Sequence, residues 1–148
     1  MNDKSQKHPN ALKRVVYEIP GMAMARIQRD VEYHLSADHP LTFDLYRADE
    51  QESSSPLPIV LCVAGFPDVG VRPPLGCCFK EVEMMVSLVQ LVSASGMAAV
   101  AYTSHRPIDD IHTVLDYLTN HAADLNHDSD DSRAIMRHML AFMRSHLT

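Results

Sequence analysis

The strongest candidate for chemistry in this 148-residue chain is the loop that follows an uninterrupted apolar run at residues 59–64. The run reads Ile-Val-Leu-Cys-Val-Ala, and Gly65-Phe-Pro-Asp68 follows it. Its length and β-branched residues predict a central strand that is buried on both faces and ends in a tight loop. Ligands of open α/β sheets bind beyond the carboxyl ends of the strands, where a glycine loop can offer backbone N–H groups to a developing oxyanion. Gly65 and Phe66 are therefore oxyanion-hole candidates, and an ordinary strand-to-helix turn is the alternative.

A second short apolar run, residues 97–102, ends in the polar stretch Thr103-Ser-His-Arg106. If both runs are parallel strands of one sheet, their carboxyl ends lie at the same edge. Asp68 and Thr103 are then candidates to line one pocket there. Asp109 and Asp110 need no catalytic role, because carboxylates in the first turn of a helix complement its dipole.

The cysteines and histidines offer no recognisable catalytic or metal centre. Cys62 lies inside the first apolar run and is expected to be core packing, whereas Cys77 and Cys78 have only Lys80 nearby as a base and are expected to be a structural pair. The closest histidines in sequence lack the i, i+4 spacing of a helical zinc pair, so we expect surface histidines and no metal: His105, His112, His121 and His127.

Composition and charge exclude several classes of function. The net charge of −6 and the absence of a basic stripe argue against nucleic acid as a partner. No segment has the apolar length of a membrane span or of a signal peptide, and three cysteines do not form a disulfide framework. We therefore expect a cytoplasmic protein without a cofactor. The length suits one domain.

The hydrophobic periodicity predicts an α/β fold. Alternation at Arg29–Leu35 and Leu41–Tyr46 predicts an antiparallel hairpin, and residues 58–64 and 97–102 predict two parallel strands. Helices are expected at about residues 79–95, 107–125 and 131–147, and residues 69–76 are too rich in proline and glycine for regular structure. Residues 1–14 are expected to be a flexible tail, and residues 15–148 a single domain.

Several of these segments, in this order, resemble an α/β-hydrolase of the dienelactone-hydrolase-like esterase group. The segments are Val63-Ala-Gly-Phe-Pro-Asp68, Leu75-Gly-Cys-Cys-Phe-Lys80, Gln90-Leu-Val-Ser-Ala-Ser-Gly-Met97, Tyr102-Thr103 and Arg106-Pro107. The resemblance covers roughly residues 30–125, and residues 128–147 resemble the terminal helix of the same group. It implies hydrolysis of a carboxylic ester or lactone by a serine, with a histidine base and an oxyanion hole to which the Gly65-Phe66 loop contributes.

The chain departs from this family where the nucleophile should be. The family carries Gly-x-Ser-x-Gly after the strand that follows the second helix. Neither this motif nor Gly-x-Cys-x-Gly occurs here, and the nearest imitation, Ser93-Ala-Ser-Gly96, has one glycine and precedes the wrong strand. The chain thus resembles a hydrolase that lacks its middle segment, with the join near residues 126–130. A deletion in the gene, an engineered shortening and an omitted segment would all leave this sequence.

Two interpretations follow. In the first, the protein is an incomplete hydrolase-like domain, inactive alone, with no identifiable catalytic residue and a small ester or lactone as the substrate of the complete family fold. In the second, it is a non-enzymatic module. Without the neighbouring strands, the strand at residues 58–64 becomes an open apolar edge, and such edges pair with other chains. That edge predicts a homo-oligomer or an interaction with another hydrolase-like chain. A gene fragment without function is a third reading.

Overall fold

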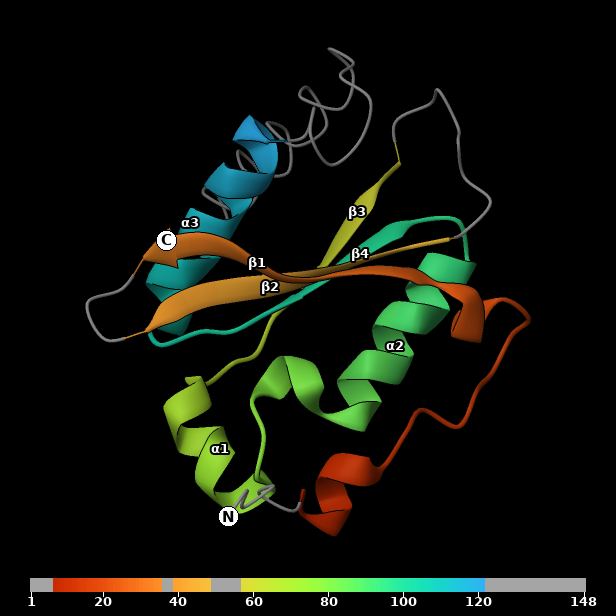
Figure 1. Cartoon of the computed structure of the whole chain (residues 1–148), viewed down its shortest axis with the longest axis horizontal. Helices are drawn as coiled ribbons and strands as arrows, with labels where there is room; N and C mark the ends of the chain where they lie inside the picture. Colours follow the sequence, from red (N-terminus) through yellow and green to blue (C-terminus); the bar gives the residue numbers. More distant parts are fainter. Residues whose placement is uncertain (1–6, 36–38, 49–56, 122–148) are drawn as a thin grey trace.

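The computed structural model describes residues 7–35, 39–48 and 57–121, which form a mixed four-stranded sheet with helices on both faces (Figure 1). The strands are β1 (Arg26–Leu35), β2 (Pro40–Arg47), β3 (Ile59–Cys62) and β4 (Ala98–Tyr102), in the order β1-β2-β4-β3. The helices are α1 (Asp68–Leu75), α2 (Glu83–Ala94) and α3 (Pro107–Asn120), with short 3-10 helices at η1 (Pro9–Leu12), η2 (Met22–Met24) and η3 (Phe79–Glu81). The α/β class expected from the sequence is confirmed.

The predicted hairpin and the predicted parallel pair are both present. Strands β1 and β2 are antiparallel, with Val31 opposite Phe43, and β3 and β4 are parallel, with Leu61 opposite Val100. Strand β2 joins the two pairs because it also runs antiparallel to β4. All five residues of β4 are buried, which makes β4 the strand that is covered on both faces.

Strand β3 differs from the prediction that residues 58–64 form a central strand buried on both faces. It is limited to Ile59–Cys62, all four residues are only partly buried, and it stands at the end of the strand order. Among the described residues only β4 pairs with it. An apolar run alone does not distinguish a central strand from an edge strand, because burial depends on what lies on the far side. Among the described residues, the side of β3 away from β4 is therefore an open edge.

Each face of the sheet is covered by one long helix (Figure 1). On one face α3 contributes Val114, Leu115 and Leu118 to a core that includes Phe43 and Val100. On the other face, Met85 and Val89 of α2 pack on Tyr46, Ala99 and Ala101. The alternation of β4 side chains between these two cores follows from the two-residue period of a strand. Together the helices hold β4, and hence the loop after it, in a fixed position.

Helix α1 was not expected, because residues 69–76 contain Pro73, Pro74 and two glycines. Both prolines lie in the second half of this eight-residue helix, where they remove only the amides that would bond to the carbonyls of Val69 and Gly70. Gly76 then ends the helix with φ 73°, and its N–H donates to the carbonyl of Arg72 at 2.8 Å. A left-handed glycine cap of this kind satisfies a helix terminus and stops the helix.

Two other helices begin or end differently from the prediction. The helix expected over residues 79–95 is divided, because Val82 has extended backbone angles between η3 and α2. The helix expected over residues 107–125 ends at Asn120, since His121 is already non-helical. The helix predicted at residues 131–147 lies outside the described residues.

Residues 7–14, assigned from sequence to a flexible tail, pack on the domain instead. Ala11 in η1 is fully buried beside Cys77 and Val82. The N–H of His8 donates to the carbonyl of Leu75 at 3.0 Å, and Lys7 donates to the carbonyl of Glu81 at 2.7 Å. Because most of this segment is polar, its composition did not indicate that Ala11 packs against the domain.

Candidate functional site

A cleft of about 580 Å³ lies where the loops after β3 and β4 meet α1. Its lining comes from the start of β2, from α1 and from the two loops, and consists of His39, Pro40, Asp68, Val69, Arg72, Pro73, Cys78, Thr103 and His105. This is the sheet edge at which ligands of α/β proteins bind. Two residues predicted to line a pocket, Asp68 and Thr103, are in this set, whereas Gly65 and Phe66 are not.

The carboxylate of Asp68 fixes the position of two loops. Oδ1 accepts a hydrogen bond from the N–H of Phe79 at 2.6 Å, and Oδ2 accepts one from the N–H of Ser104 at 2.7 Å. The N–H of Asp68 itself donates to the carbonyl of Ser104 at 2.8 Å. Asp68 is buried, and each of its carboxylate oxygens accepts a hydrogen bond from a main-chain N–H. At the cleft, Asp68 therefore mainly links the loops that carry Phe79 and Ser104.

The hydroxyl of Thr103 is also engaged by the main chain. Oγ1 accepts from the N–H of Thr42 at 2.9 Å and lies 3.1 Å from the carbonyl of Thr42, to which it donates. The carbonyl of Thr103 accepts from the hydroxyl of Tyr33 at 2.6 Å. Because burial raises the pKa of Tyr33, this hydroxyl stays protonated as a donor. Thr103 therefore extends the β2–β4 pairing to the rim of the cleft.

Gly65 and Phe66 stand outside the cleft, on the surface of the loop after β3. A Cβ added at Gly65 would meet nothing within 4 Å, so nothing among its neighbours requires a glycine there. Phe66 is 49% exposed and lies edge-on to Phe79, with 5.8 Å between ring centroids. None of these contacts involves the backbone N–H groups of Gly65 and Phe66. An oxyanion-hole role for the two residues therefore stays a prediction.

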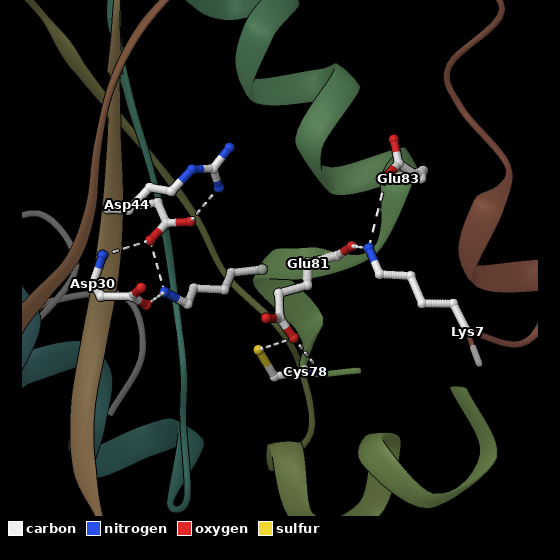
Figure 2. Close-up of polar contacts among 8 residues, drawn as sticks. Lys7, Asp30, Asp44, Cys78, Glu81 and Glu83 are labelled. Atoms are coloured by element: carbon white, nitrogen blue, oxygen red, sulfur yellow. Dashed lines mark hydrogen bonds and ion pairs between the residues drawn. The ribbon is translucent and has the colours of Figure 1, made fainter. Parts of the chain in front are cut away.

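Cys78 is the one thiol that borders the cleft, and its surroundings suppress its reactivity. It is 3% exposed, and its Sγ donates to Oε2 of Glu81 at 2.9 Å, as does its N–H at 3.0 Å (Figure 2). Burial, together with the hydrogen bond and negative charge of Glu81, raises the pKa of Cys78 to about 12. A thiolate is the reactive form of cysteine, so this environment disfavours nucleophilic attack.

Asp110 organises the loop after β4, a role that its place in a first helical turn did not reveal. Its Oδ2 accepts from the N–H groups of His105 and Arg106, both at 2.7 Å, and from the hydroxyl of Ser104 at 3.1 Å. Asp110 and Ser104 are both buried. Ser104 is not among the residues that line the cleft, and its hydroxyl donates to Asp110.

A second charged cluster, formed by buried Lys80 and Asp44 with the exposed Asp30, lies away from the cleft and was not anticipated. Lys80 is 4% exposed, and its Nζ lies 2.6 Å from Asp44 and 2.5 Å from Asp30 (Figure 2). The N–H of Asp30 also donates to Asp44 at 2.9 Å. Asp30 has φ 52° at an irregularity in β1, which turns its side chain to Lys80. The cluster links η3 to the β1–β2 hairpin. Because its residues are far apart in sequence, no local sequence pattern predicts their contact.

The sequence also missed two of the cleft's basic residues, Arg72 and His39. Arg72 lay in a stretch expected to be irregular, so it could not be assigned to a helix face, and His39 belonged to a turn.

In residues 7–35, 39–48 and 57–121, no three histidine, cysteine or acidic side chains are grouped to hold a metal ion. No helix within those ranges has the length and apolar character needed to cross a membrane.

A scan against known protein-family models gives no match, and no curated protein matches the sequence significantly. Function is therefore argued from the residues and geometry of the site. A fold of this class hosts many activities, so the α/β architecture by itself does not decide among them.

Proposed function

We propose that this chain is an α/β-hydrolase-like protein, related to hydrolases of carboxylic esters or lactones, that has no hydrolase activity by itself. The observation that carries this proposal is the state of the nucleophile candidates at the cleft and next to it. The hydroxyl of Thr103 is bonded to the main chain of β2, the hydroxyl of Ser104 to Asp110, and the thiol of Cys78 to Glu81.

Acyl transfer needs a nucleophile within hydrogen-bond reach of a base, and in the described segments no serine, threonine or cysteine side chain is hydrogen-bonded to a histidine. The sequence as a whole also lacks Gly-x-Ser-x-Gly. The proposed relationship and the proposed inactivity thus have different supports: the order of motifs for the first, and the engaged side chains for the second.

Hydrolysis of p-nitrophenyl acetate by the full chain tests this proposal. Free histidines and lysines react slowly with such esters, so the urea-unfolded chain is the matched control. We expect the folded protein to show no saturation with ester and no rate above that of the unfolded chain. Saturable turnover that disappears on unfolding would refute the proposed inactivity.

A second candidate function is self-association through β3. It is favoured by the open edge, next to which Val63 is 46% and Phe66 is 49% exposed. An edge strand offers unpaired N–H and C=O groups, and two copies of β3 could pair antiparallel across a two-fold axis. The proposed occupant of this edge is therefore a second copy of the chain.

Native mass spectrometry and light scattering decide whether the edge pairs. We expect a dimer for the unmodified chain and a monomer for Val63→Lys, because a lysine beside an edge strand opposes pairing. Val16→Lys is the matched control, since Val16 is fully exposed and far from β3 in sequence. A monomeric unmodified chain with one cooperative melting transition would contradict self-association.

A further inference from the structure

The cleft brings together three basic side chains from separate parts of the chain. Arg72 comes from the last turn of α1, His105 from the loop after β4, and His39 from the position before β2. None of these side chains forms an ion pair or hydrogen bond with another described residue. The fold holds them at one concave site without using them for its own contacts. Nitrogen donors left unpaired at a cleft are suited to bind an acceptor from outside.

Asp68 is the acidic residue among those that line the cleft, and it does not neutralise these donors. Both of its oxygens accept main-chain hydrogen bonds from Phe79 and Ser104. Its buried negative charge nevertheless remains close to the cleft, and this limits the ligand. A dianion such as phosphate would be repelled more strongly than an ion of single charge.

The rest of the lining is apolar and includes Val69 of α1 with Pro40 and Pro73. The volume of about 580 Å³ is in the range of small-molecule sites, which usually combine apolar walls with a few polar groups. An arginine matches a carboxylate well, since its planar guanidinium can donate two parallel hydrogen bonds to the two oxygens.

We propose that this cleft binds a small monocarboxylate with an apolar body. Arg72 holds the carboxylate, His39 and His105 donate to it from the sides, and the valine and prolines contact the body of the ligand. This binding does not require hydrolysis or any relationship to hydrolases. The site can therefore be real whether or not the chain is catalytically active.

Titration of the full ¹⁵N-labelled chain with sodium benzoate, followed by NMR, tests the site. We expect shifts to be concentrated at the N–H groups of Val69, Arg72 and His105 as benzoate rises to about 10 mM, a range suited to a fragment-sized ligand. Benzyl alcohol has a similar ring and no charge, and we expect it to bind at least about tenfold more weakly because it lacks the carboxylate–guanidinium contact. Inorganic phosphate is expected to bind more weakly than benzoate.

Arg72→Gln and Arg106→Gln separate a built site from general attraction to positive charge. Both remove one exposed arginine, but Arg106 is outside the lining and pairs with Asp109 at 3.0 Å. We expect Arg72→Gln to weaken benzoate binding about tenfold or more and Arg106→Gln to change it less than about twofold. The spectrum of each free variant shows whether it is folded.

The proposal would be overturned by the absence of a benzoate-dependent shift at the cleft, by equal affinity for benzoate and benzyl alcohol, or by equal weakening by the two arginine substitutions. Tighter binding of phosphate than of benzoate would assign the cleft to a different class of anion and also overturn it. None of these results depends on ester turnover, so they leave the proposed inactivity to its own test.

Discussion

The joining role of Asp68 gives the most quantitative prediction. In Asp68→Asn one amide oxygen can still accept from Phe79 or from Ser104, but the amide NH₂ then faces the other main-chain N–H. Each of the two bonds is charge-assisted, and such bonds contribute about 1.5–3 kcal/mol. Losing one, weakening the other and opposing two donors should lower the free energy of unfolding by about 2–4 kcal/mol. That is a large part of the stability of a small domain, about 5–15 kcal/mol.

Urea unfolding followed by far-UV circular dichroism measures this loss. Asp116→Asn is the matched control, because it makes the same chemical change at an exposed position of α3 and should shift stability by less than about 0.5 kcal/mol. The N–H resonances of Phe79 and Ser104 should move in Asp68→Asn and not in the control. Equal unfolding midpoints for the two variants would refute the assignment of Asp68 as the link between the loops.

Three further predictions concern buried Lys80 and Cys78, and Asp30, whose side chain is 73% exposed. Lys80→Met should cost about 3 kcal/mol, because the buried charge of Asp44 then keeps only its longer ion pair with Arg29, at 3.5 Å. Adding Asp44→Leu should recover part of that loss in urea unfolding, and strictly additive losses would contradict the pair. The hydrogen bond from Lys80 lowers the pKa of Asp30, so the stability this contact adds is present above about pH 4 and lost as the pH falls through the folded-state pKa. The urea midpoint should therefore fall more steeply on acidification in the unmodified chain than in Asp30→Asn, and parallel curves would contradict this. Cys78 should resist iodoacetamide at pH 8 in the folded protein and react once unfolded, as mapped by peptide mass spectrometry; rapid labelling in the folded state would contradict a raised pKa.

The elements that sequence periodicity predicted well are those whose burial repeats along the chain. Val31, Tyr33 and the alternating residues of β2 predicted the hairpin. Helix α1 was missed because Pro73 and Pro74 are strong signals against a helix, although here they affect only its second half. Prolines are a local signal against a helix. The hydrogen bond from the N–H of Asp68 to the carbonyl of Ser104, which holds the start of α1, involves a loop that is distant in sequence, so no local pattern indicates it.

The sequence indicated which residues come near the cleft better than it indicated what they do. By the rule that parallel strands end at one edge, Asp68 and Thr103 were expected to lie together, and both line the cleft, whereas Gly65 and Phe66 do not. Their partners, Phe79, Ser104 and Thr42, lie 11 to 61 positions away in sequence. Which hydroxyl or carboxylate is engaged by the main chain depends on such long-range contacts, so the sequence could not separate a joining residue from a reactive one.

The most direct test of the account is incubation of the folded, full chain with a fluorophosphonate probe, followed by intact-mass spectrometry. This probe labels a serine that an adjacent base has activated. We predict an unchanged mass, because the chain has no Gly-x-Ser-x-Gly and the hydroxyls of Thr103 and Ser104 are engaged by Thr42 and Asp110. Stoichiometric labelling of one serine, lost in the unfolded chain, would contradict the proposal that this chain has no serine-hydrolase activity by itself.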